Sequence, residues 1–183
     1  MQVGIPHKHM TRTDLNSEEF NPYYSNYIKL VDGDKELLEA LKDGKEKTQT
    51  YFESIPPEKW KYAYAEGKWT LLEVLQHIID TERIFSYRAL CIARNDKTEF
   101  PGFEQDEYVK PSNANNRTME ELLLEYNAVR TSSIFLFEGL DEKSLSRIGK
   151  ASNSPISARA AGFIIAGHEI HHANIITERY LMD

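Results

Sequence analysis

The chain has 183 residues, of which 40% are hydrophobic and 28% are charged, as is typical of one globular domain large enough to bury a core. Its formal net charge of −7 argues against nucleic acid as a partner, and no apolar run approaches the ~18 residues of a membrane span. The first residues lack the apolar region of a secretion signal, and the single cysteine excludes an internal disulfide, so we expect a cytoplasmic protein.

The beginning of the chain, residues 1–30, is predicted to be an N-terminal arm outside a domain formed by residues 31–183. Residues 1–21 are polar and aperiodic. Residues 21–31 add three tyrosines and several apolar side chains, which favours a cap on the core or an interface rather than chemistry. Asp34 then follows a turn and is predicted to cap the next helix.

Four helical segments follow, at about residues 35–54, 70–94, 118–139 and 157–181. Thr70 and Thr118 each stand three residues before a glutamate, which is the pattern of a capping box, and Ser157 is the expected cap of the last helix. Gly44 is tolerated inside the first helix at a cost of about 1 kcal/mol. No strand-like alternation of any length is present. The pattern predicts an all-α protein, a four-helix bundle.

The connection between the second and third helices is long. Residues 95–117 contain two prolines, a glycine and two phenylalanines. A link of this length in a compact domain is either functional or a crossover over one end of the bundle.

Three histidines are predicted to point inward from two of the helices. On the fourth helix His168 and His172 lie one turn apart within the apolar stripe, and His171 lies on its shoulder. His77 lies on the inward face of the second helix. Each could be an ordinary hydrogen-bonded core histidine, but three neutral imidazoles with an open position are a known catalytic metal arrangement. We therefore predict a metal site formed by His77, His168 and His172.

A rival interpretation is a zinc peptidase, because residues 168–172 match H-E-x-x-H with Glu169 as the general base. The extended form of that motif needs glycine and histidine where this chain has Ile175 and Glu178. Only eleven residues follow His172, too few for the further helix that supplies a downstream ligand. The sequence therefore disfavours a peptidase.

The stretches at residues 69–90 and 167–181 together resemble the DinB-like superfamily, a group of small four-helix proteins that includes YfiT-type metal-dependent hydrolases. The resemblance covers residues 30–182, and its mark is a lone histidine on the second helix with H-x-x-x-H on the fourth. It maps the metal ligands onto the same three histidines. It implies a divalent ion, with zinc or nickel expected first and iron or copper also suited to imidazole ligands.

Biochemically characterised members of that group resemble S-transferases, in which a divalent metal activates a low-molecular-weight thiol such as bacillithiol. The resemblance therefore implies a metal-dependent enzyme that adds or transfers such a thiol to an electrophilic small molecule. One alternative is a hydrolase that uses metal-bound hydroxide. Another is a non-catalytic, stress-associated bundle that binds metal for stability. The resemblance also implies a homodimer.

Other charged residues could serve the same site. Glu73 and Asp80 are candidate partners for a ring N–H of a ligand histidine. Arg88 and Arg179 follow the metal-side stripes of their helices and could bind a carboxylate of the thiol cofactor, unless they pair with acids of the chain. Glu82 points away from the His77 face, and we expect it to be structural.

Overall fold

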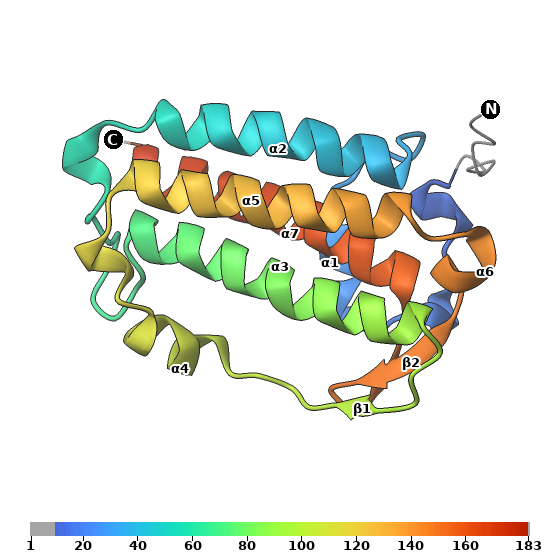
Figure 1. Cartoon of the computed structure of the whole chain (residues 1–183). Coiled ribbons are helices and arrows are strands. Elements are labelled where there is room, and N and C mark those ends of the chain that lie inside the picture. Colours follow the sequence, from blue (N-terminus) through green and yellow to red (C-terminus); the bar gives the residue numbers. More distant parts are fainter. Residues whose placement is uncertain (1–9, 183) are drawn as a thin grey trace.

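The computed structural model describes residues 10–182, and its framework is a bundle of four long helices (Figure 1). These helices are α2 (Leu37–Glu53), α3 (Leu71–Ala93), α5 (Met119–Glu138) and α7 (Ala158–Ile176). Both α2 and α3 pack against α5 and α7, so these two consecutive helices occupy diagonal corners of the bundle. The predicted all-α four-helix bundle is therefore confirmed, and three of the four helices end within one or two residues of the expected positions.

The predicted caps of three helices are also present. The Thr70 hydroxyl accepts the N–H of Glu73 at 3.2 Å, and Thr118 accepts that of Glu121 at the same distance. Ser157 caps α7 in the same way. These side chains satisfy backbone donors that the first turn of a helix leaves free.

The predicted cap at Asp34 is wrong. Glu36 is the residue before α2, and its side chain makes no capping hydrogen bond. The N–H of Leu37 instead donates to the carbonyl of Met10 at 2.9 Å, because Thr11 forms an antiparallel bridge with Glu36. A distant backbone segment thus replaces a local side-chain cap.

A small sheet lies at one end of the bundle, although no strand is predicted from the sequence (Figure 1). It consists of β1 (Glu99–Phe100), β2 (Ile148–Ala151) and β3 (Ser154–Ser157), in the order β1-β2-β3. The β1 and β2 strands are parallel, and β2 and β3 form an antiparallel hairpin. Strands of two to four residues are too short to show a periodic pattern, which is why they were not predicted.

The last helix was expected to run to residue 181, but its α-helical part ends at Ile176 and a π-helical turn, Thr177–Leu181, follows. A short helix, α6 (Glu142–Leu145), precedes the hairpin. No helix within residues 10–182 is long and apolar enough to cross a membrane.

The long connection is a crossover that returns along the bundle, because α3 and α5 run in the same direction (Figure 1). It contains β1 and α4 (Gln105–Val109), followed by the 3₁₀ turns Lys110–Ser112 and Ala114–Asn116. The α4 helix packs against α3. The crossover therefore covers the length of α3, rather than only one end of the bundle.

The N-terminal segment packs on the bundle as well. It contains the 3₁₀ turns Arg12–Asp14, Ser17–Glu19 and Pro22–Tyr24, then the helical turn α1 (Ser25–Ile28), which packs against α7. Met10 and Ile28 are buried in the same cluster as the bundle core. The domain boundary near residue 30 stays a prediction.

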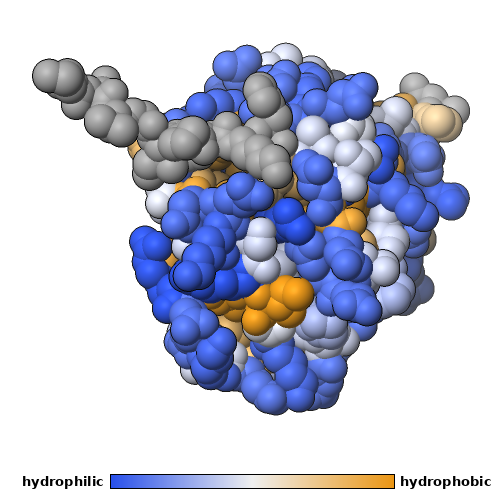
Figure 2. Space-filling model, turned by 90° about the vertical axis from the view of Figure 1, so that its right-hand side faces the viewer, coloured by the Kyte–Doolittle hydropathy of each residue, from blue (hydrophilic) through white to orange (hydrophobic). Residues whose placement is uncertain are grey.

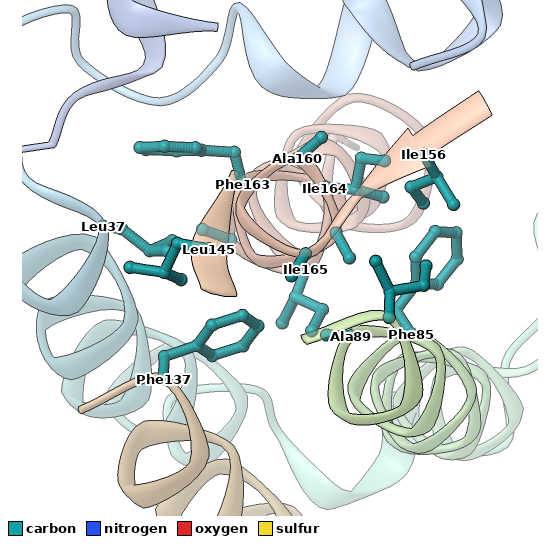
Figure 3. Packing of buried hydrophobic residues seen from close by; sticks show 14 of the residues in the cluster. Leu37, Phe85, Ala89, Phe137, Leu145, Ile156, Ala160, Phe163, Ile164 and Ile165 are labelled. Carbon is teal, nitrogen blue, oxygen red and sulfur yellow. The ribbon is translucent and has the colours of Figure 1, made fainter. Parts of the chain in front are cut away.

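The α7 helix lies at the centre of the hydrophobic core. Phe163, Ile164 and Ile165 of α7 face side chains from several other elements, including Phe85 of α3 and Phe137 of α5 (Figure 3). Outside this core, the end of the molecule seen in Figure 2 is mostly hydrophilic, with a hydrophobic patch below its centre.

A buried ionic network links the four helices. Arg130 of α5, which is fully buried, donates to both carboxylate oxygens of Glu82 (2.8 and 2.9 Å) and of Glu169 (3.0 and 2.8 Å). Tyr126 and Thr48 donate to Glu169 at 2.7 and 3.1 Å. Burial alone would lower the pKa of Arg130, but the two carboxylates outweigh it and hold that pKa well above its ordinary value.

Gly44 of α2 is required by this network rather than merely tolerated. A Cβ atom at this position would lie 1.9 Å from Oε1 of Glu169 and 3.0 Å from Nη1 of Arg130. Because both side chains are fixed by their mutual hydrogen bonds, neither can move without losing partners. The missing side chain lets α2 approach the network.

We therefore expect Gly44→Ala to destabilise the protein, although alanine favours a helix more. Disrupting a buried charge pair costs about 3 kcal/mol or more, and the gain in helix propensity is about 1 kcal/mol. The net loss in the free energy of unfolding should be about 2 kcal/mol, measured by urea denaturation. Gly139→Ala is the control, since its Cβ would meet no atom closer than 3.4 Å and the variant should remain stable. Equal stability of the two variants would contradict this role of Gly44.

Candidate metal centre

The three histidines selected from the sequence converge in the structure. Nε2 of His168 lies 3.1 Å from Nε2 of His77 and 3.0 Å from Nε2 of His172. One ring nitrogen from each residue lies within 4.8 Å of those of the other two. Three nitrogens at about 2.0–2.1 Å from one ion are separated by roughly 3 Å, so these contacts have the spacing that a shared divalent ion requires.

The electrostatic environment keeps these imidazoles neutral at neutral pH. Burial lowers the pKa of His77 to about 4, although the nearby Asp106 carboxylate acts in the opposite direction. Burial and the neighbouring imidazoles lower the pKa values of His168 and His172 well below the usual range. A neutral imidazole has a lone pair available for a metal ion, and little proton competition opposes binding.

Aromatic side chains enclose the histidine cluster. The ring of Trp69 lies 4.7 Å from that of His77, and the ring of Tyr27 in α1 meets His168 edge-on at 5.4 Å. Tyr27 also contacts His171 at 5.1 Å. The sequence assigned residues 21–31 to a cap or an interface, and the structure brings Tyr27 of that segment to the cluster.

Gly167, directly before His168, allows this approach. A Cβ atom on Gly167 would lie 2.0 Å from the backbone carbonyl oxygen of Tyr27. Backbone atoms cannot yield as a flexible side chain can, so only glycine lets α1 lie this close to α7. The conformation of the N-terminal segment and the wall of the site thus depend on one missing side chain.

Two cavities border the histidine cluster. A cavity of about 240 Å³ is lined by His77 and His168, and a larger one of about 720 Å³ is lined by His171 and His172. Gln105 of α4 lines both cavities. The site is therefore open to small molecules from more than one side.

The crossover supplies one wall of the site. Phe103 lines the smaller cavity and Asp106 the larger one, while Gln105 stands between them. Sequence reasoning noted the unusual length of this connection but did not single out these residues. The only available signal was that a long ordered connection is often functional.

The predicted acidic partners are engaged away from the cluster. The Glu73 carboxylate accepts from the N–H of Thr70 and from Asn115, at 2.8 and 2.9 Å. Asp80 accepts from Gln76 at 3.0 Å. Within residues 10–182 neither acid is hydrogen-bonded to a ring of the cluster, although Glu73 lines the larger cavity.

The two predicted arginines lie in different environments. Arg88 is buried, and one of its N–H groups donates to the carbonyl of Pro101 at 2.6 Å. Arg179 is exposed on the π-helical turn Thr177–Leu181. Arg88 is therefore held against the crossover at Pro101, whereas Arg179 faces solvent.

Glu169, the glutamate of the peptidase-like motif, has a structural role in this protein. Glu169 is 3% exposed and is bound by Arg130, Tyr126 and Thr48 in the buried network. Its carboxylate is thereby held by partners on α2 and α5 and is not available to act as a general base at the histidine cluster. The H-E-x-x-H match is therefore not a peptidase site, because His168 and Glu169 face different sides of α7.

We expect Gly167→Ala to displace α1 from α7. The clash is with backbone, so the expected result is faster amide hydrogen exchange over residues 25–31 and a melting temperature lower by several degrees. Gly102→Ala is the control, because the nearest atom to its Cβ would be Oγ of Ser152 at 3.4 Å. Unchanged exchange at residues 25–31 in Gly167→Ala would show that α1 does not depend on this glycine.

Solved structures with a similar fold include two from Bacillus subtilis. One is YfiT, described as a probable metal-dependent hydrolase with an unusual four-helix bundle topology; it has 15% identity, a TM-score of 0.67 and coverage of 97% of this chain and 95% of YfiT. The other is the DinB-like protein YjoA, with 18% identity, a TM-score of 0.55 and coverage of 78% of this chain and 87% of YjoA. At these identities the likeness shows the fold.

The sequence itself gives a family assignment. No curated protein matches it. The model of the DinB superfamily, however, matches residues 40–176, which include all three histidines of the cluster and the four bundle helices except the first residues of α2. The chain therefore belongs to the DinB superfamily.

Proposed function

We propose that this protein is a metal-dependent enzyme that transfers or adds a low-molecular-weight thiol of the bacillithiol type to an electrophilic small molecule. The observation that carries the proposal is the convergence of His77, His168 and His172 at a point bordered by two cavities. Neutral imidazoles suit zinc, nickel, iron or copper, with zinc or nickel proposed first. A divalent ion held there would supply Lewis acidity, which lowers the pKa of a thiol or of water.

The two cavities favour a reaction of two substrates. A hydrolase needs space for one organic substrate besides water, whereas a thiol transferase has to bring a thiol and an electrophile to the same point. The smaller cavity reaches the site at His77 and His168, and the larger one reaches it at His172. Holding two reactants at one point makes the reaction effectively unimolecular.

The residues around the cluster would assist by orientation and by exclusion of water. Tyr27 and Trp69 cover the rings of His168 and His77, so these aromatic side chains shield part of the cluster from water. In such a setting electrostatic interactions are stronger than in water. The thiol sulfur then forms a bond to the electrophilic carbon, the leaving group departs from that carbon with the electron pair, and the thiol proton passes to solvent.

Hydrolysis is the second candidate, and the description of YfiT as a probable metal-dependent hydrolase favours it. It would use the same three histidines with water in place of the thiol. The two candidates differ in whether turnover needs a thiol. A third role, in which the metal only stabilises the bundle, would give neither activity.

The metal site is tested first: the protein, purified without a histidine tag, should bind about one divalent ion per chain. Saturation with zinc or nickel at 100 times the dissociation constant should stabilise the fold by about 2.7 kcal/mol. Alanine at His77, His168 or His172 should abolish the stabilisation, measured by thermal melting and elemental analysis.

His171→Ala is the matched control, because His171 lies on the same helix but outside the cluster. It should retain one ion per chain. If any of the three cluster variants bound metal as well as the parent, the ligand assignment would be wrong.

The proposed reaction is tested by the conjugation of bacillithiol with monobromobimane, which should depend on the metal and is measured by fluorescence. The sulfur–carbon bond forms as bromide leaves, and the rate should fall to background on chelation or in His77→Ala. Ester hydrolysis without any thiol would instead support the hydrolase. If neither bacillithiol nor glutathione reacted above background in the metal-loaded protein, the transferase proposal would fail.

A further inference from the structure

Arg88 is a buried cation without an acidic partner among residues 10–182. Its side chain is 3% exposed, and within residues 10–182 no carboxylate lies within ion-pair distance of it. Arg130, which is also buried, pairs with two carboxylates. An unpaired buried charge is costly to a fold, so a position that retains one points to a counter-charge supplied from outside the chain.

The guanidinium lies directly behind aromatic side chains that line the 240 Å³ cavity. Its Cζ atom is 5.2 Å from the ring centre of Phe85 and 5.9 Å from that of Phe103, and both rings line the cavity. Tyr24, which lines it too, lies close enough to Arg88 for the two side chains to affect each other's pKa values. One N–H of Arg88 is used by the carbonyl of Pro101, and a guanidinium has five such donors.

The spacing along α3 places this cation at the far end of the cavity from the histidines. His77 and Phe85 both line the cavity and are eight residues apart, about 12 Å along a helix. The Arg88 side chain leans back toward Phe85, as long side chains on helices do. A ligand that reached both Arg88 and the histidines would be roughly 10 Å long, and aromatic rings would flank its middle.

We propose that the smaller cavity binds a small organic acid, with its carboxylate at the end next to Arg88, where the charge of the guanidinium attracts it, and its flat apolar body among Tyr24, Phe85 and Phe103. This inference rests on the proposed function, because it names the substrate class of the same site. Arginine suits the role, since its planar donors match a carboxylate. The chain as a whole carries a net charge of −7, so an anionic ligand would be selected by this local cation and not by the overall field.

The test compares trans-cinnamate with trans-cinnamamide, which have the same shape and differ in charge. Binding of each to the full chain is measured by isothermal titration calorimetry, with no thiol and no electrophile present. The acid should bind at least about tenfold more tightly than the amide, because a hydrogen bond to a charged group is worth more than a neutral one. Arg88→Gln should abolish the preference, and Arg94→Gln, at the exposed end of the same helix, should retain it.

Arg88→Met is a second variant in case Arg88→Gln does not fold, since it keeps the apolar length of the side chain without its charge. Circular dichroism shows which variants are folded. Equal affinity of the parent for the acid and the amide would overturn the inference. An acid preference that survived in a folded Arg88 variant would overturn it as well.

The outcome is separable from that of the transferase assay. A preference for cinnamate that depends on Arg88, in a protein that conjugates no thiol, would support the anion site while the proposed reaction failed. Conjugation of bacillithiol by a protein that binds the acid and the amide equally would support the proposed reaction, whereas the anion site would fail.

Discussion

The buried pairing of Arg130 with Glu82 and Glu169 is the constraint on which the arrangement of the helices depends. A fully buried guanidinium is stable only if its charge and its donors are matched, and here the partners come from α3 and α7 while α2 adds the carbonyl of Leu41 at 3.2 Å. Moving any of these helices would leave a charge unpaired. The network therefore fixes the rotation of α7 about its axis.

The rotation of α7 determines which side His168, the residue before Glu169, faces. Successive residues on a helix point about 100° apart, so once Glu169 faces Arg130, His168 faces another side. His172 follows His168 by one turn, and both meet His77 on α3. The ionic network and the histidine cluster thus lie on two different faces of α7. Because the network holds α7 in one orientation, it also holds the histidines in position.

Close backbone approach is the second requirement. Gly44 leaves room for Glu169, and Gly167 leaves room for the carbonyl of Tyr27. Both glycines lie inside helices, where glycine costs conformational entropy. The fold accepts this cost because any side chain would displace an element that encloses the network or the site. Arg88 adds a buried charge that no carboxylate in the described part of the chain pairs with, a further feature that stability alone does not explain.

The sequence by itself determined the four helices, three of their caps and the inward direction of the three histidines, because all of these follow from local periodicity and local hydrogen bonding. The unusual length of the crossover is also evident from the sequence. Only the tertiary structure decided that His77 reaches the depth of His168, that Glu169 belongs to Arg130 and that Tyr27 and Gln105 border the site. These are contacts between segments far apart in the chain, and helical periodicity says which way a side chain points but not what it meets.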